Sequence, residues 1–93
     1  MRREGETLHL EGPVTLQTVP QLLAEAAEHL AEVRRVDFAG ATEVDSAAVA
    51  LALELQRQAR ERSAPLTLEH FPPAMENLAR LYGVSELLQP AAA

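Results

Sequence analysis

The stretch that decides the fold is Val36–Leu55, VDFAGATEVDSAAVALALEL. Its first four residues form a mostly apolar run that is typical of a short strand, and this run breaks at Gly40. After the pair Asp45-Ser46 comes an almost uninterrupted apolar segment, Ala47–Leu55, which predicts a helix. We therefore expect a strand, a short loop and a helix capped by Ser46. The polar pair would lie at the unpaired N–H groups and the positive dipole end of that helix.

Two short strands are expected before this stretch. Thr7–Glu11 alternates between polar and apolar residues in the strand period, and Gly12-Pro13 is a turn signal. Val14–Leu16 contains β-branched residues and can form a second strand. Together these segments predict a hairpin-like pair with its turn at the Gly-Pro dipeptide.

A helix is expected next, with Thr18 as its N-cap and Gln21 three residues later in a capping box. Pro20 is tolerated in the first turn of such a helix. The apolar side chains form one stripe, as expected for a surface helix that covers a sheet. The stripe comprises Leu22, Leu23, Ala26, Ala27 and Leu30.

The central helix is expected to run from Ala47 to Arg62. Its first two turns are apolar nearly all round, whereas its last two turns are polar and begin at Gln56. A helix that is apolar on every side must be covered on more than one side. Because the sheet of so small a domain covers only one side, we infer that a neighbouring helix or another protein covers the rest.

A strand, Leu66–His70, follows the central helix and should lie parallel to Val36–Ala39, because a helix connects the two. Pro72-Pro73 begins a third helix, and Gly83 is a typical helix stop. The third helix carries an apolar stripe. The stripe is Met75, Leu78, Ala79 and Tyr82.

The last expected elements are a short turn capped by Ser85 and a frayed tail at Ala91–Ala93. The expected order of elements is β-β-α-β-α-β-α-α. We therefore predict an α/β fold in which helices cover a small mixed β-sheet. The chain should form a single domain, residues 1–93, with an ordered core of about 7–88.

Composition narrows the functional class. The 93 residues carry a net charge of −6 and contain no cysteine, which excludes disulfides and cysteine-based zinc sites. Net negative charge argues against nucleic acid and anionic membrane surfaces as partners. The N-terminus has no apolar signal segment, and the longest apolar run, Ala47–Leu53, is too short to cross a bilayer. We expect a soluble, cytoplasmic protein.

Few residues suggest chemistry. His9, His29 and His70 are far apart in the sequence and do not form a His-x-x-x-His pair, so solvated or edge-strand histidines are favoured over a metal site. Asp37 and Asp45 flank the expected loop, and a carboxylate pair could serve acid–base chemistry or Mg²⁺. No nucleophile–base set or phosphate-binding glycine loop accompanies them. We therefore expect no enzyme activity, no cofactor and no metal, and interpret Asp45 as a cap of the loop and helix.

Ser46 has three interpretations that periodicity alone does not separate. It can be a plain N-cap, typically worth about 1 kcal/mol relative to alanine. It can be a phosphoacceptor, because a helix N-terminus tolerates a phosphate. It can also make a polar contact with a protein partner.

With Val36–Leu55 described, the chain resembles the STAS family, the sulfate transporter and anti-sigma-factor antagonist domains. The resemblance lies in a Val-Asp-x-x strand followed by an apolar-Asp-Ser/Thr turn that opens an apolar helix, here VDFAGATEVDSAAVALAL. The order of elements agrees with the family over roughly residues 7 to 88.

Two branches of the family are relevant. Anti-sigma-factor antagonists carry Asp-Ser-Ser/Thr-Gly with a phosphorylated hydroxyl at the second residue after the Asp; that position is Ala47 here, and Ala48 stands for the glycine. The MlaB-type branch of phospholipid ABC transporters resembles the chain more closely. Its Asp-Thr-Ala-Gly pattern is matched by Asp45-Ser46-Ala47, and its Leu-Ala-x-Leu-Tyr pattern by Leu78–Tyr82.

The MlaB-type resemblance implies a non-catalytic regulatory subunit of a phospholipid transporter, which maintains outer-membrane lipid asymmetry. The subunit would be cytoplasmic and bind the ATPase of the transporter, together with its permease, peripheral to the inner membrane. The alternative is an anti-sigma-factor antagonist-type signalling module. The expected partner face lies on the central and third helices, unless these residues merely pack under neighbouring helices. Its residues are Asp45, Ser46, Ala47, Ala50, Leu51, Glu54, Arg80 and Leu81.

Overall fold

The computed structural model describes residues 1–88 of the chain, and the expected order of elements is confirmed. The tail expected at Ala91–Ala93 lies outside the described residues. The elements are β1 (Arg2–Glu4), β2 (Thr7–Val14), α1 (Val19–Ala27), β3 (Arg35–Val44), α2 (Ser46–Glu61), β4 (Thr67–Glu69), α3 (Pro73–Leu81) and the 3₁₀-helix η1 (Ser85–Leu88).

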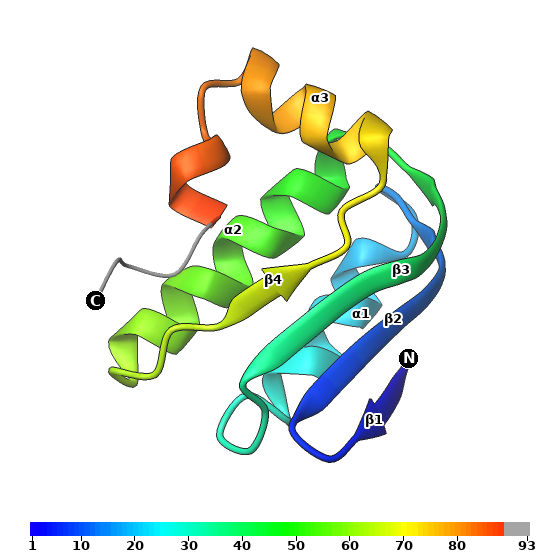
Figure 1. Ribbon diagram of the computed structural model, residues 1–93. Coiled ribbons are helices and arrows are strands. Elements are labelled where there is room, and N and C mark those ends of the chain that lie inside the picture. Colours follow the sequence, from blue (N-terminus) through cyan, green and yellow to red (C-terminus); the bar gives the residue numbers. More distant parts are fainter. Residues whose placement is uncertain (89–93) are drawn as a thin grey trace.

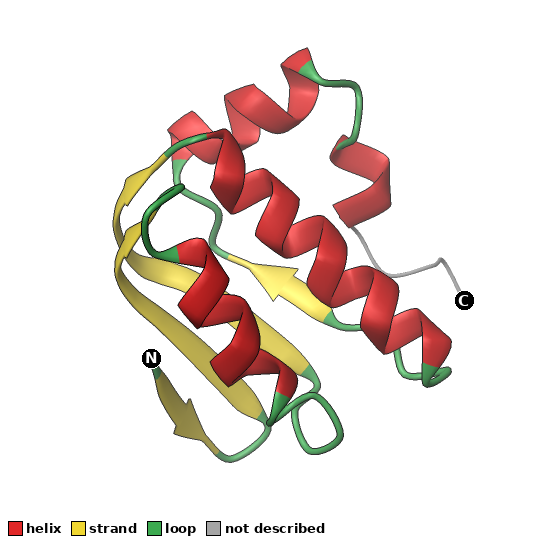
Figure 2. Cartoon of the chain, turned by 180° about the vertical axis from the view of Figure 1, so that it is seen from behind, coloured by secondary structure: helices red, strands yellow, loops and turns green. Residues whose placement is uncertain are grey.

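The four strands form one mixed sheet in the order β1-β2-β3-β4. β1 is antiparallel to β2, whereas β2–β3 and β3–β4 are parallel pairs, as predicted for the two strands that flank the central helix. The helices lie on one face of the sheet, as Figures 1 and 2 show from opposite sides. Strand residues that point to this face are almost fully buried. They are Leu8, Leu10, Val36, Phe38 and Leu68.

The predicted hairpin at Gly12-Pro13 is wrong, because both residues lie inside the single strand β2. The hairpin instead joins β1 to β2 through a turn at Gly5, which has a positive φ of 61°. β1 starts before the expected ordered core and pairs only as far as His9. Pro13 therefore faces no strand on that side, so its missing N–H breaks no ladder bond there. A register irregularity between Gly12 and Pro13 accommodates the dipeptide.

The predicted break at Gly40 is also wrong, because β3 continues through it to Val44. A Cβ at Gly40 would lie 2.9 Å from the Leu10 carbonyl oxygen and 3.1 Å from the Glu11 side chain. Glycine is therefore required there by the close approach of β2 and not by a turn.

The Thr18 side chain makes no cap bond to α1, and the predicted capping box is absent. The Thr18 hydroxyl accepts the Thr15 N–H and donates to the Pro13 carbonyl, which closes the loop before the helix. Gln21 binds Glu25 one turn further on. Local side-chain bonds of this kind compete with capping.

Helix α2 packs between α1 on one side and α3 with η1 on the other. The predicted need for cover on several sides is therefore met largely within the chain. α3 ends as predicted at Gly83, which has a positive φ of 69°. The Val84 N–H bonds the Ala79 carbonyl and the Gly83 N–H bonds the Arg80 carbonyl, which is the Schellman arrangement.

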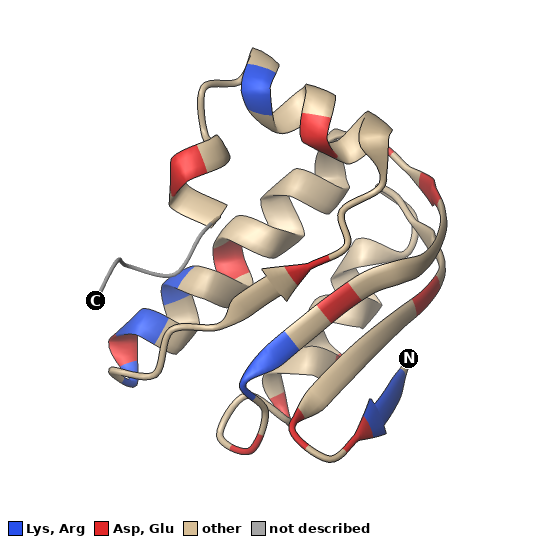
Figure 3. Cartoon of the chain, in the orientation of Figure 1, with Lys and Arg blue, Asp and Glu red and all other residues tan. Residues whose placement is uncertain are grey.

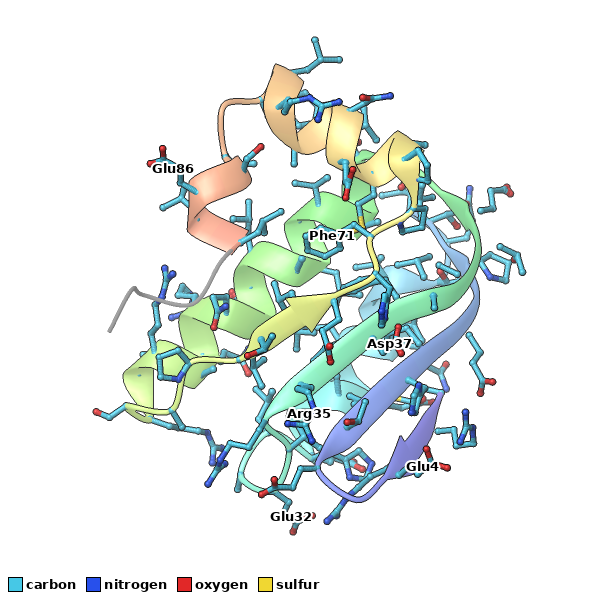
Figure 4. The ribbon with its side chains drawn as sticks, viewed as in Figure 1. Glu4, Glu32, Arg35, Asp37, Phe71 and Glu86 are labelled. Carbon is cyan, nitrogen blue, oxygen red and sulfur yellow. The ribbon has the colours of Figure 1, made fainter. Side chains whose placement is uncertain are left out.

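The segment between β4 and α3 is fixed to the core by an aromatic pair. The rings of Phe38 and Phe71 lie 5.1 Å apart, centroid to centroid, in an edge-on arrangement. Figure 4 shows Phe71 between this segment and α2. The start of α3 is thereby positioned beside α2.

Candidate partner-binding site

The junction between β3 and α2 is organised by Asp45. Its backbone is extended, at φ −137° and ψ −167°, and it is the N-cap of α2. The interpretation of Asp45 as a cap of the loop and helix is thereby confirmed, whereas the cap predicted at Ser46 is one residue out. One carboxylate oxygen accepts the Ala47 N–H at 2.8 Å and the other accepts the Leu16 N–H at 3.0 Å. Asp45 therefore fixes the helix start and the loop before α1 at the same time.

The three residues that follow Asp45 have different environments. Ser46 is the first residue of α2 and is exposed, while Ala47 is half-buried. Ala48 is fully buried. Its methyl group therefore lies in the core and does not face outward, whereas the Ser46 hydroxyl is presented to solvent at the positive end of the helix dipole.

Further along α2, Ala50 is exposed one turn after Ser46. Leu51, which was expected on the partner face, is only 1% exposed and belongs to the core. Successive residues lie about 100° apart around a helix, so Leu51 falls on the buried side of α2 and Ala50 on its exposed side. Figure 3 shows no charged residue in α2 before Glu54.

Glu54 marks the end of this uncharged part of α2. Its carboxylate accepts the Arg57 Nε–H at 2.8 and 2.9 Å, and this hydrogen bond lowers the pKa of the Glu54 carboxyl despite an opposing effect of desolvation. The carboxylates of Glu54 and Glu61 in turn raise the pKa of the Arg57 guanidinium. Glu54 is thus an ionised group held against its own helix.

The residues expected on α3 lie on both sides of that helix. Leu78 is partly buried and Ala79 is buried, so half of the Leu-Ala-x-Leu-Tyr pattern serves the core. Arg80 is exposed and bonds Asn77, while Leu81 and Tyr82 are 79% and 55% exposed. The C-terminal end of α3 therefore exposes one cation, one leucine and one tyrosine.

Leu16 was missed as a candidate, because the sequence pattern placed it in a strand. It lies in the loop after β2 and its side chain is 71% exposed. The bond from its N–H to Asp45 brings it to the start of α2. Leu16, Ser46 and Ala50 together form what we term the α2 strip.

A second polar group lies on the open face of the sheet, away from the helices. One Asp37 oxygen lies 3.1 Å from His70 Nδ1, and the other lies 3.4 Å from His9 Nδ1. Glu4 extends this chain, with an oxygen 3.5 Å from His9 Nε2. Figure 4 shows Asp37 and Glu4 on this face. Two of the three histidines are therefore brought together, which their sequence spacing does not predict.

The pKa of the Asp37 carboxyl is set by opposing effects. Burial raises this pKa, but the hydrogen bond from the Ala39 N–H, at 2.8 Å, and the two histidines together lower it by more. The pKa of Asp37 therefore lies below its usual value of 3.8. Asp37 and Asp45 lie near opposite ends of β3, so they form no carboxylate pair. Within residues 1–88, no group of three or more His, Asp or Glu side chains could hold a metal ion.

The described part of the chain contains no helix with the length and hydropathy needed to cross a membrane. The α2 strip offers groups for contact with another molecule: one hydroxyl, one small apolar side chain and one large exposed leucine. Both oxygens of Asp45 are engaged by backbone N–H groups.

Comparison with protein families extends this description. The family model described as "Mlab, STAS domain" matches residues 1–89. The chain belongs to this MlaB-type STAS family. In this STAS domain the two patterns that suggested the family correspond to the Asp45 cap and to the C-terminal half of α3.

Structural comparison supports the STAS fold. The structure titled "Structure of the Anti-Sigma Factor Antagonist SpoIIAA in its Unphosphorylated Form" is similar, with a TM-score of 0.64 at 21% sequence identity. The match covers 87% of the STAS domain described here and 79% of SpoIIAA. At this identity the likeness shows the fold alone. None of the curated proteins matches the chain.

Proposed function

We propose that this STAS domain is a non-catalytic regulatory subunit that binds the ATPase of an Mla-type phospholipid ABC transporter. The observation that carries the proposal is the α2 strip, where the uncharged side chains of Ser46, Ala50 and the neighbouring Leu16 lie exposed at the start of the central helix. Such a surface permits close approach of another protein. The MlaB-type family match supports this kind of partner.

The argument depends on several exposed residues lying close together, because single exposed leucines are common on soluble proteins. Leu16 is tied to Asp45, Ser46 follows directly, and Ala50 lies one turn along the same helix. Ala47 contributes its exposed part beside Ser46. Glu54 with Arg57 closes the far end of this surface. Arg80 and Leu81, exposed at the C-terminal end of α3, are a second part of the proposed partner face.

In this proposal the domain is cytoplasmic and peripheral to the inner membrane, where the assembled transporter holds it. It binds the ATPase in complex with the permease and stabilises the assembled or active form. Phospholipid transport, and with it outer-membrane lipid asymmetry, would depend on the domain, although the domain itself would not bind the lipid.

The proposal is tested by co-purification of the tagged chain with its ATPase. Ala50→Arg and Ser46→Trp place bulk on the α2 strip and should weaken binding at least about tenfold, as expected when a well-packed interface is disrupted. Ala24→Arg is the matched control, since Ala24 is an exposed alanine on α1. Binding that survives Ala50→Arg and Ser46→Trp, with all variants folded, would contradict the proposal.

The alternative is an anti-sigma-factor antagonist-type module controlled by phosphorylation. Ala47, at the usual phosphoacceptor position of that branch, has no hydroxyl. Mass measurement of the intact chain after incubation with cell extract and ATP separates the two functions. A phosphorylated chain that captures a kinase in place of an ATPase would favour the alternative.

A further inference from the structure

The loop between β2 and α1 exposes a large apolar side chain on a backbone that is held in place. The Leu16 side chain is 71% exposed, whereas its neighbour Thr15 is buried. The Thr15 carbonyl accepts the backbone N–H groups of Thr18 and Val19, at 3.0 and 2.8 Å, and the Thr15 N–H donates to the Thr18 hydroxyl at 2.9 Å. Leu16 is therefore presented from a fixed loop, although most of its side chain lies in solvent.

Asp45 adds a bond from a distant part of the chain. One of its carboxylate oxygens accepts the Leu16 N–H at 3.0 Å, and the other accepts the Ala47 N–H at 2.8 Å. Capping α2 needs only the second of these bonds, and serine and asparagine cap helices about as well as aspartate. Those two side chains have one acceptor oxygen each, whereas a carboxylate has two. The additional oxygen of Asp45 ties the loop to the start of α2.

An apolar side chain that is already held in position suits the binding of another protein. Ordering a mobile loop or side chain on association costs free energy, and a group that is held in its bound position beforehand avoids much of this cost. Protein interfaces are commonly built around an aliphatic or aromatic anchor that fills a pocket of the partner. Leu16 is the one large apolar side chain of the α2 strip.

We propose that Leu16 is the anchor residue of the partner interface, and that Asp45 is a positioning residue that holds Leu16 in place without touching the partner. This inference rests on the proposed function and names the chemistry of the partner surface: the ATPase offers an apolar pocket that takes one aliphatic side chain. It also changes the role expected of Asp45, because both of its oxygens already accept backbone N–H groups.

The dissociation constant for the co-purified ATPase tests the anchor. Leu16→Ala should weaken binding at least about tenfold, whereas Leu16→Met keeps the volume and should weaken it less than about threefold. The matched control is Leu87→Ala, because Leu87 is also an exposed leucine, at 52%, but lies on η1 outside the proposed partner face. This control should change binding less than about twofold.

The outcomes separate this inference from the proposed function. If the unaltered chain binds no ATPase, the proposed function fails and this inference fails with it. If the unaltered chain binds and Leu16→Ala binds equally well, this inference alone is wrong.

A double-mutant cycle tests the positioning role of Asp45. Asp45→Asn keeps a good N-cap but has one acceptor oxygen, so it cannot accept both N–H groups. It should weaken binding about three- to tenfold in the unaltered chain and have little further effect in the Leu16→Ala background. An equal loss in both backgrounds would show that Asp45 acts through the helix start or by direct contact, and would overturn this role.

Hydrogen exchange of the free, unmodified chain needs neither a partner nor a variant. After correction for intrinsic rates, the Leu16 amide should exchange at least about tenfold more slowly than the Gln17 amide, because Asp45 accepts the Leu16 N–H. Gln17 is the next residue of the same loop and is also exposed. Equal exchange at both amides would show that Asp45 does not hold the loop, and would overturn the proposal whether or not Asp45→Asn folds.

Discussion

Gln56 shows how one side chain completes a sheet edge. Its Nε2–H donates to the Leu66 carbonyl and its Oε1 accepts the Leu66 N–H, both at 2.7 Å. The side chain is 1% exposed, although the sequence placed it on a polar helix end. Its carboxamide stands where the peptide group of a further strand would stand. The backbone of the residue just before β4 is thereby satisfied on its outer side.

Replacing Gln56 with leucine should be strongly destabilising. The variant leaves the Leu66 N–H and carbonyl buried without partners, at a cost of about 2–4 kcal/mol for the two groups. Urea denaturation measures the loss. Gln58→Leu on the same helix is the control and should change stability by less than about 0.5 kcal/mol, because Gln58 is only half-buried. Equal effects of the two substitutions would refute this role of Gln56.

At the level of residues, the sequence identified Asp45 and Ser46 as candidate caps of α2 but did not decide which of the two is the N-cap. Asp and Ser are equally good caps, so propensity does not choose between adjacent candidates. The choice depends on the Leu16 N–H, which comes from a distant part of the chain. Gln56 could not be assigned for the same reason, since its partner lies ten residues further on.

At the level of elements, the strands that continue through glycine were the hardest to predict. Gly12, Pro13 and Gly40 are local turn signals, yet each lies inside a strand. Tertiary context overrides the signal, through the open edge beside Pro13 and the tight approach of Leu10 to Gly40. The helices were predicted better, because their apolar periodicity and the stop at Gly83 are properties of the local sequence.

Helix α2 ends in an arrangement that favours glycine but has a serine. Ser63 has a positive φ of 57°, and the Ala64 N–H bonds the Ala59 carbonyl, as in the Schellman motif. Ser63→Gly should therefore stabilise the domain by about 0.5–1 kcal/mol, since left-handed backbone is costly for residues with a Cβ. Thermal and urea unfolding provide the measurement. Ser85→Gly, where φ is not positive, should give no gain; a gain there as large as at Ser63 would contradict the explanation.

At the level of the whole molecule, a row of polar side chains crosses the sheet, from Glu4 through His9 and Asp37 to His70. It links β1, β2, β3 and the residue after β4, which itself has a positive φ of 58°. The order of elements on the helix side was predictable from periodicity. This polar chain was not, because it depends on the register between strands.

The lowered pKa of Asp37 predicts how stability depends on pH. A carboxyl with a lower pKa in the folded state adds stability that is fully present above its unfolded value of 3.8 and is lost as the pH falls through the folded value. Asp37→Asn lacks this contribution. The difference in unfolding free energy between the two proteins should therefore be largest near about pH 6 and shrink towards about pH 2.5. A difference that stays constant across this range would show that Asp37 contributes no such linkage.

The packing of the other helices around α2 also explains why the prediction of Leu51 on the partner face was wrong. Apolar residues occur nearly all round the first two turns, so the sequence could not tell Leu51 from Ala50. With α1 and α3 in place, Leu51 is enclosed, and the exposed residues of the first two turns are Ser46 and Ala50.

Ser46 and Ala50 are small and lie four residues apart on one helix, and their size limits how close a second helix can pack against α2. Packed helices lie about 8–10 Å apart, axis to axis, depending on the side chains between them. A helix laid across this part of α2 would settle at the short end of that range, where main chains come close enough for Cα–H···O contacts. One larger side chain at either position would push the second helix outward and remove these Cα–H···O contacts. A substitution here would therefore weaken packing by its size alone, without any change of charge or hydrogen bonding.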